Sequence, residues 1–342
     1  MKKLIAIILT LMLTLGSVVA LAEGVKLGIV TPDADHGFTG ESVAHARAEA
    51  EALKASGAID DYMMGVGGEA SKQSQAIDDI LTWGADVVML WPLEGDQLRN
   101  SAQTIVDEGK KLVIYDRLIE NFEGKVAEIM GDNEGIGNMM GEYLLKVYAD
   151  RLKAGEKITY LLFIGDSSTV SKQRTQGMLD VLDKSEYKDQ FVLLQDGFQT
   201  DWSNAKAQEF MENWINTAGA ETIADLDLIV THDDEIVDGI TTVLQNASGF
   251  DSLSLITSVG GRRETLSTYD SIEKPALVTY FFSPSYIREA LRLSVAAAKG
   301  ETYQGQEISG QLFLIPSMEI DKSTVDAYRA SQEFADRYSI NP

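Results

Sequence analysis

The sequence predicts an α/β protein whose parallel sheets are covered by helices on both faces. The first observation is a series of short apolar runs, which indicate buried parallel strands. The second is helical spacing between those runs, as in Ile77, Ile80 and Leu81 at i, i+3 and i+4. The third is length, because about 320 residues remain after an N-terminal leader and suffice for two ordinary domains.

Eight apolar runs are predicted to be strands, and they alternate with helical segments from end to end. In order, they are residues 25–31, 87–90, 111–115, 158–164, 191–194, 226–231, 253–259 and 276–282. A short strand at 62–64 and a C-terminal strand near 311–316 are also expected. Ligands of such sheets bind beyond the carboxyl ends of the strands, so the residues that follow each strand are the ones to inspect.

The first 22 residues have the layout of a secretory signal peptide. Lys2 and Lys3 precede an apolar run over 4–15, and a small-residue site ends at Ala22, before Glu23. The run is shorter than the roughly 20 residues that a membrane-spanning helix needs. The chain has no cysteine, which excludes a lipid-modified N-terminal Cys. We therefore expect cleavage near Ala22 and a mature protein that is free in the periplasm.

Composition argues against several classes of partner. The formal net charge is −24, and removal of Lys2 and Lys3 with the leader makes it −26. Nucleic acids and anionic lipids bind clustered Lys and Arg, so neither is expected as a partner. Hydrophobic residues make up 44% of the chain and no low-complexity tract is present, which predicts a folded protein.

Motifs for catalysis or cofactor binding are weak or missing. Residues 65–70 match a G-x-G-x-x-A dinucleotide pattern, but they follow the second strand and lack a clear acidic partner, so a turn is the better interpretation. The chain has 3 His residues, no G-x-S-x-G elbow and no H-E-x-x-H or EF-hand sequence. We expect no catalytic residue, no metal and no cofactor.

The ends of the predicted strands carry acids, bases and flat aromatic side chains together. The candidates are His36 and Phe38, Trp91, Asp116 with Arg117, Lys172, Trp202, Asp233 and Phe282. Charged groups make directional hydrogen bonds to hydroxyls, and aromatic faces cover the C–H face of a sugar ring. Some candidates have simpler explanations, since Phe38 and Phe282 suit a core, Asp116 and Arg117 a surface ion pair, and Asp234 a helix start. The combination nevertheless favours a polyhydroxylated ligand.

Several of these segments, taken in order, resemble the periplasmic sugar-binding proteins of type I fold, the ribose- and galactose-binding group that serves ABC transporters. They are Asp35-His36-Gly37-Phe38, Asp116-Arg117, Gly131-Asp132-Asn133, 168–177, Asp201-Trp202 and Asp233-Asp234-Glu235. The resemblance covers essentially the whole mature chain. It implies two Rossmann-like lobes, 23–131 with 283–307 and 132–282 with 308–342, joined by a hinge that the chain crosses three times. The implied crossings are at 131–132, near 259–262 and near 283–284.

The resemblance also implies roles for the candidates. His36 stands where the family often has a sugar-binding Asn, Lys172 where the ribose-binding pattern has Arg, and Phe282 where Gln is common. Phe38 and Trp202 would cover the sugar ring, Trp91 would face the ligand, and Asp116, Arg117 and Asp233 would bind hydroxyls. The segment Gly260-Gly261-Arg262-Arg263 replaces a stretch that usually contains a sugar-binding Asp, and its role is left open.

The expected function is capture of a monosaccharide or polyol between the lobes, hinge closure, and delivery to an ABC transporter permease in the inner membrane. The protein would act as a monomer and would not be an enzyme. One alternative is a ligand sensor that docks a chemoreceptor. Another is a secreted hydrolase, which would need an activated nucleophile and base that no motif supplies.

Overall fold

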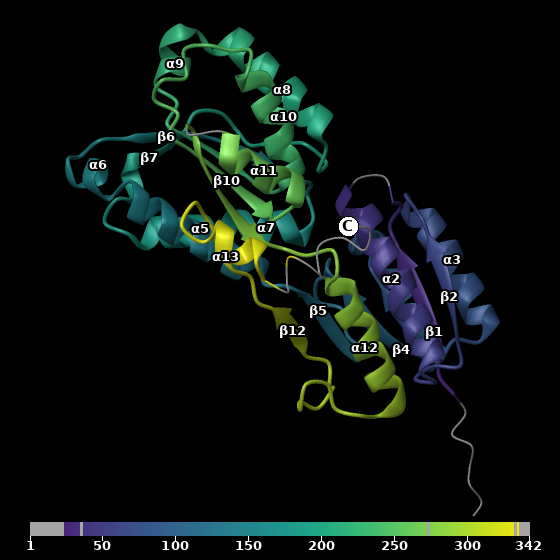
Figure 1. Ribbon diagram of the computed structural model, residues 1–342. Coiled ribbons are helices and arrows are strands. Elements are labelled where there is room, and N and C mark those ends of the chain that lie inside the picture. Colours follow the sequence, from purple (N-terminus) through teal and green to yellow (C-terminus); the bar gives the residue numbers. More distant parts are fainter. Residues whose placement is uncertain (1–23, 35–36, 272–273, 332–333, 335–342) are drawn as a thin grey trace, which may run out of the picture.

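The computed structural model describes residues 24–34, 37–271, 274–331 and 334, and it shows two α/β lobes (Figure 1). Each lobe has a parallel or mostly parallel sheet with helices on both faces, as predicted. The expected leader, its cleavage near Ala22 and the candidate His36 lie outside the described residues. No helix in the described part of the chain has the length and apolar character needed to cross a bilayer.

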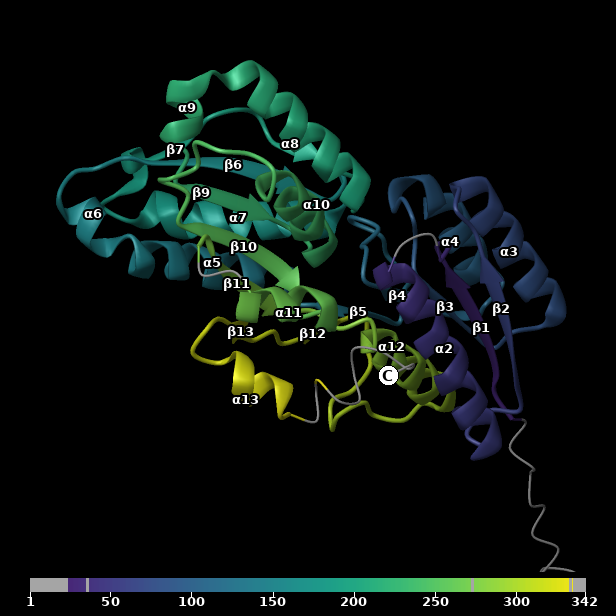
Figure 2. The same ribbon diagram turned by 45° about the horizontal axis from the view of Figure 1, so that its top comes forward.

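The first lobe contains a six-stranded sheet in which every pairing is parallel. Its order is β12 (Leu312–Ile315), β5 (Ala127–Gly131), β4 (Lys111–Tyr115), β3 (Val87–Leu90), β1 (Lys26–Thr31) and β2 (Asp61–Val66). One face packs against α2 (Gly37–Ala55) and α12 (Tyr286–Lys299), and these helices lie together in Figures 1 and 2. The other face packs against α3 (Ala70–Trp83) and α4 (Arg99–Asp107), which the short η1 (Asp96–Leu98) precedes.

The second lobe contains a seven-stranded sheet in which only β13 is antiparallel. Its order is β13 (Glu319–Ile320), β11 (Ala276–Phe281), β10 (Leu255–Gly260), β9 (Leu228–Thr231), β6 (Ile158–Ile164) and β7 (Phe191–Leu193), with β8 (Phe198–Gln199) also on β6. One face packs against α5 (Asn133–Val147) and α7 (Thr169–Lys184), and the other against α8 (Asn204–Ala218) and α10 (Asp234–Leu244). The remaining helices are α6 (Ala149–Lys153), η2 (Lys188–Gln190), α9 (Ala220–Ala224), α11 (Arg263–Ser271) and α13 (Val325–Arg329).

All eight predicted strands are present, with ends that differ by no more than two residues from the prediction. The prediction missed β5 because Glu128 and Gly131 interrupt its apolar run. Glu128 is nevertheless buried, and Lys125 compensates its charge at 3.2 Å. The short strand expected at 62–64 is part of the longer β2. Apolar runs therefore find strands that are uniformly apolar and miss those that bury a compensated charge.

The chain crosses between the sheets at three places, and one expected crossing is wrong. It leaves the first sheet after Gly131, returns between β11 and α12, and crosses last between β12 and β13. No crossing occurs near 259–262, because β10, α11 and β11 follow one another within the second lobe. A glycine-rich loop after a strand resembles a linker in sequence, although here it only joins a strand to its own helix.

The C-terminal strand expected near 311–316 exists as β12, but its assignment to the second lobe is wrong. β12 pairs in parallel with β5 in the first sheet, where Leu312 lies opposite Glu128. Phe313 is buried against Tyr303, with ring centroids 5.3 Å apart. The first lobe therefore continues to about residue 315 instead of ending at 307. An apolar run specifies a strand, but it does not specify which of two sheets accepts it.

Helices α5 and α7 touch through their backbones. A Cβ atom at Gly177 would lie 2.5 Å from the carbonyl oxygen of Glu134, and one at Gly137 would lie 2.4 Å from that of Arg174. Neither position tolerates a side chain while the helices stay this close. The contact brings Asn133 and Arg174 together at the end of the lobe that faces its neighbour.

We predict that Gly177→Ala lowers the free energy of unfolding by about 1–3 kcal/mol, because the added methyl group overlaps backbone and forces the helices apart. Gly40→Ala is the matched control, since no atom lies within 4 Å of a Cβ at that helical position. It should raise stability by about 0.5–1 kcal/mol through helix propensity. Urea unfolding monitored by circular dichroism measures both, and equal effects at the two positions would contradict the close helix contact.

Candidate functional site

A cavity of about 380 Å³, counting its opening to solvent, lies between the two lobes. Its wall takes residues from both lobes and from the hinge between them. They are Phe38, Thr39, Trp91, Asp116 and Arg117 from the first lobe, Val170, Arg174, Trp202 and Asp233 from the second, and Phe282 from the hinge. The cavity lies beyond the carboxyl ends of parallel strands, where ligands of such sheets bind, and its size suits a small molecule.

Seven of the nine predicted site residues line this cavity. His36 is outside the described residues. Lys172 is exposed, and it faces a separate pocket at the rim beside Glu94 and Glu120. The structure therefore places Lys172 outside the cavity wall, and its role in ligand binding stays a prediction.

Arg174 occupies the place that Lys172 was expected to fill. Residues two apart on a helix point to nearly opposite sides, so only one of these two cations can face the cavity. The buried positions of α7 include Val170, Arg174 and Gly177, at i, i+4 and i+7. That apolar spacing was a signal in the sequence, and it would have selected Arg174.

Asp116 follows β4 and is held in the left-handed region with φ 64°. One carboxylate oxygen, Oδ2, accepts a 3.0 Å hydrogen bond from the indole nitrogen of Trp91. The other, Oδ1, is buried and has no hydrogen-bond partner among the described residues. Burial raises the pKa of Asp116, although Arg117 and Arg174 oppose that rise. An unsatisfied buried acceptor that lines a cavity is available to a ligand hydroxyl.

Arg117 links the two lobes. Its Nη1 donates to the carbonyl of Leu93 at 2.6 Å in the first lobe, and its Nη2 forms a 3.0 Å ion pair with Asp166 in the second. Burial alone would raise the pKa of Asp166, but Arg117 and hydrogen bonds from Ser168 outweigh it and lower that pKa. Nε of Arg117 stays buried without a partner among the described residues. The pair holds the lobes together and leaves one donor for a ligand.

Arg174 is the cation at the centre of the site. Its Nε donates to Oδ1 of Asn133 at 2.9 Å, and its Nη1 donates to the carbonyl of His232 at 2.6 Å. Its guanidinium carbon lies 4.6 Å from the ring centroid of Phe282 and 5.7 Å from that of Trp202. Burial lowers the pKa of Arg174 to about 10, so the group is still charged at neutral pH. The described residues leave its Nη2 as the donor for a ligand.

Trp202 forms an aromatic wall of the cavity in the second lobe. Asp201 and Trp202 both have positive φ, 49° and 61°, and this turn brings the indole against the backbone of Gly165. A Cβ at Gly165 would lie 2.3 Å from the indole ring, so only glycine fits there. The indole N–H is buried and has no hydrogen-bond partner of good geometry, although it lies near enough to Asp166 to help lower that pKa.

Asp233 caps helix α10 and also lines the cavity. Its Oδ1 accepts a 2.7 Å hydrogen bond from the amide of Glu235, and Oδ2 has no partner among the described residues. Burial, together with the charges of Glu235 and Asp234, raises the pKa of Asp233 to about 8. The carboxyl is therefore largely protonated at neutral pH in this structure.

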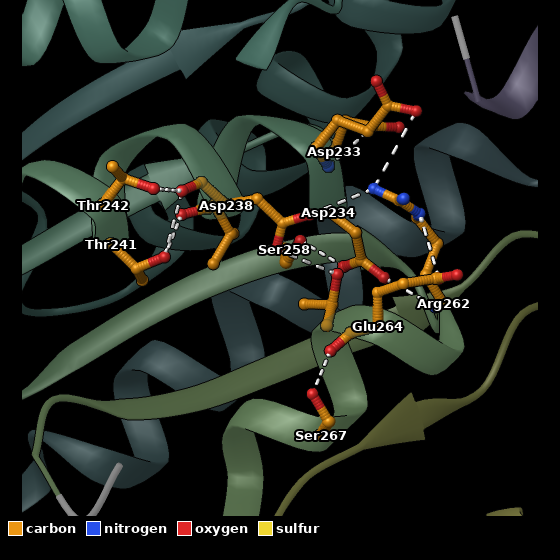
Figure 3. Close-up of polar contacts among 12 residues, drawn as sticks. Asp233, Asp234, Asp238, Thr241, Thr242, Ser258, Arg262, Glu264 and Ser267 are labelled. Carbon is orange, nitrogen blue, oxygen red and sulfur yellow. Dashed lines mark hydrogen bonds and ion pairs between the residues drawn. The ribbon is translucent and has the colours of Figure 1, made fainter. Parts of the chain in front are cut away.

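Asp234 explains the segment 260–263, whose role the sequence left open. Its buried carboxylate accepts hydrogen bonds from the amides of Gly261 and Arg262, both at 2.8 Å, and from the hydroxyls of Ser258 and Thr279. Figure 3 shows Asp234 between Ser258 and Arg262. Asp234 thus fixes the backbone of this loop, and none of the residues 260–263 is among those that line the cavity.

Arg262 belongs to an ion-pair network outside the cavity wall. It lies 3.1 Å from Asp238, 3.7 Å from Glu264 and 3.9 Å from Glu235 (Figure 3). Burial raises the pKa of Asp238 to about 6 despite Arg262. In the described part of the chain, no group of three or more His, Asp or Glu residues is arranged to hold a metal ion.

We predict that Asp233→Asn flattens the dependence of stability on pH. An unfolded Asp ionises at about 3.9, whereas the folded Asp233 keeps its proton up to about 8. The folded state therefore binds the extra proton across this window, and the free energy of unfolding falls as pH rises, by up to about 1.4 kcal/mol per unit. Asn removes that fall. Denaturant unfolding across the same window measures it, and an unchanged slope would contradict the raised pKa.

Asp166→Asn provides the control of opposite sign, because its pKa is lowered instead of raised. Its ionised form contributes stability that is present above the ordinary Asp pKa and is lost as pH falls through the lowered value. The Asn variant should therefore be less stable than the wild type at neutral pH.

A family described as periplasmic binding protein domain matches residues 27–302. The D-xylose-binding periplasmic protein of Haemophilus influenzae is 24% identical over 269 residues, which cover 78% of this chain and 76% of that protein.

Two solved structures have the same fold. An ABC transporter solute binding protein from Bacillus halodurans with bound myo-inositol has a TM-score of 0.74 at 16% identity, covering 90% of this chain and 98% of that one. The binding protein of the arabinose ABC transporter from Shewanella sp., bound to L-arabinofuranose, has a TM-score of 0.74 at 19% identity, covering 91% and 96%. Because the family match runs through both lobes and includes every residue of the cavity wall, the chain belongs to the periplasmic binding protein family.

Proposed function

We propose that this protein captures a monosaccharide or polyol between its lobes and delivers it to an ABC transporter permease. The observation that carries the proposal is the cavity wall, which combines two carboxyl groups, two guanidinium groups and aromatic rings from both lobes. Hydroxyl groups donate to the carboxylates and accept from the guanidinium groups, while the rings cover C–H surface. Relatives named for D-xylose, myo-inositol and L-arabinofuranose bind this class of ligand.

The same cavity argues for binding without chemistry. His232 lies beside the cavity wall, where its carbonyl accepts from Arg174, and burial lowers its side-chain pKa to about 3. It is neutral at physiological pH, and its Nε2 lies 3.3 Å from Thr175 and not against an acidic partner. The named relatives are binding proteins. We therefore propose a non-enzymatic monomer of the periplasm, and a chemoreceptor would be a further partner for the same ligand-bound form.

A thermal-shift panel of pentoses, hexoses, polyols and inositols tests this function on the purified mature protein. A ligand at a hundred times its Kd adds about 2.7 kcal/mol of stability, which raises the melting temperature measurably. Amino acids and short peptides serve as the comparison set. Stabilisation by that set alone would overturn the proposal.

We predict that Arg174→Lys weakens binding of the best panel ligand by about tenfold to a hundredfold, because Lys cannot reproduce the fixed donor geometry. Lys172→Ala is the matched control on the same helix. It should change affinity by less than about twofold, since an exposed charge outside the cavity contributes little. Isothermal titration calorimetry measures both variants. A larger loss of affinity in Lys172→Ala than in Arg174→Lys would indicate that Lys172, and not Arg174, binds the ligand.

We predict that the ligand shifts the protein toward the closed arrangement. The described structure has direct contacts between lobes, the Arg117–Asp166 ion pair and a 3.2 Å hydrogen bond from the Leu118 amide to Thr169. A ligand bound by both lobes has higher affinity for this arrangement, and that difference shifts the population. Small-angle scattering should show a smaller radius of gyration with saturating ligand. Identical curves would indicate a rigid pocket.

A further inference from the structure

Phe282 gives the cavity an apolar wall at the hinge. Its ring packs on Phe38 and Tyr286, with centroids 5.5 and 5.3 Å apart, and one face lies under the guanidinium of Arg174. On the other side, a Cβ at Gly131 would lie 2.1 Å from the ring of Phe282. The ring can therefore lie this close to the hinge backbone only because residue 131 is glycine. With 5% of its surface exposed, the ring has no room to swing away from a ligand.

The hinge backbone around Phe282 offers little to a ligand either. The carbonyls of Gly131, Phe281 and Pro316 already accept hydrogen bonds from the amide of Asn133 (3.1 Å), the hydroxyl of Ser317 (2.7 Å) and the hydroxyl of Tyr286 (3.4 Å). A ligand hydroxyl directed at this wall would lose its water against the ring of Phe282 and would have to share carbonyls that already accept a hydrogen bond. The hinge side of the cavity therefore accepts C–H surface.

The free polar atoms of the cavity wall come from the two lobes. The acceptor is Oδ1 of Asp116, Oδ2 of the protonated Asp233 can donate as well as accept, and the donors are Nε of Arg117, Nη2 of Arg174 and the indole N–H of Trp202. Each hydroxyl donates one hydrogen bond and accepts others, so one acceptor and one or two donors serve a hydroxyl. The described wall therefore offers hydrogen-bonding groups to ligand hydroxyls near Asp116 in the first lobe and near Asp233 in the second.

We infer that the ligand is a sugar or polyol with one apolar edge, such as a pentose or a deoxy sugar, and that Phe282 selects it. This rests on the proposed function. A hexose carries a hydroxyl or hydroxymethyl group around its whole ring, and an inositol carries a hydroxyl on every carbon. Either one would bury a polar group against Phe282, whereas a pentose, which lacks the hydroxymethyl group, or a deoxy sugar presents carbon there.

Matched ligand pairs test the selection on the wild-type protein. Each pair differs in one group: D-xylose with D-glucose, L-arabinose with D-galactose, and D-fucose with D-galactose. Within a pair that binds, the ligand that lacks the hydroxymethyl or hydroxyl group should have a Kd at least about tenfold lower. Isothermal titration calorimetry measures both Kd values. Tighter binding of the hexose in every pair that binds, or of myo-inositol over all of them, would overturn the inference while leaving sugar binding intact.

Two substitutions locate the effect at Phe282. Phe282→Gln places an amide at the hinge wall and should narrow the ratio of affinities within the binding pair to less than about threefold. Phe282→Leu keeps the wall apolar and should preserve the wild-type preference. Far-UV circular dichroism and thermal unfolding establish that each variant is folded. An unchanged ratio in a folded Gln variant would show that Phe282 does not select the ligand.

These outcomes distinguish the proposed function, sugar or polyol binding, from the ligand preference assigned to Phe282. Stabilisation by no sugar or polyol, in the panel or in these pairs, would overturn the proposed function together with this inference. Binding of sugars with a preference for the fully hydroxylated partner would overturn the inference alone. A pentose or deoxy preference that Gln narrows and Leu retains would support both.

Discussion

The organisation of this molecule depends on one buried cation, the guanidinium of Arg174. A charge removed from water costs several kcal/mol unless hydrogen bonds and opposite charges compensate it. Here the compensation comes from Asn133 on the neighbouring helix, from the carbonyl of His232 at a strand end, and from the charge of Asp116. Two aromatic faces cover the guanidinium. Most of the features that define the site are requirements of keeping this group charged and in place.

That requirement reaches into the fold. Asn133 can bond Arg174 only because α5 and α7 touch at Gly137 and Gly177, so two glycines in the helix interior are part of the site. Compensation of the Arg174 charge also involves the other lobe, since the charge of Asp116 in the first lobe acts on Arg174 in the second. The lobes therefore hold charges of opposite sign that face each other across the cavity, and the Arg117–Asp166 pair repeats that arrangement at its edge. Closure of the lobes brings these opposite charges close to one another, so that each compensates the other when water leaves the cavity.

The sequence could specify the class of fold because apolar runs and helical spacing are local properties. It also located most of the cavity wall, because ligand sites of parallel sheets follow the strands, and Trp91, Asp116 and Asp233 directly follow or lie just after β3, β4 and β9. It failed where the answer depends on orientation or on distant pairing. Lys172 and Arg174 differ only in which side of α7 they occupy, and β12 differs from a second-lobe strand only in the sheet that accepts it.

The loop at 260–263 and Phe282 adjoin each other, because the amide of Phe282 donates to the carbonyl of Gly260 at 3.0 Å. A Cβ at Gly260 would lie 2.7 Å from the carboxylate of Asp234, which already binds the amides of the loop. A further acid in that loop would join Asp233, Asp234 and Glu235, where like charges already contribute to raising the pKa of Asp233 to about 8. A loop without an acid avoids this added repulsion, and none of its residues is among those that line the cavity. Phe282 lines the cavity beside this loop, and its ring offers a ligand carbon surface and no hydrogen-bonding group.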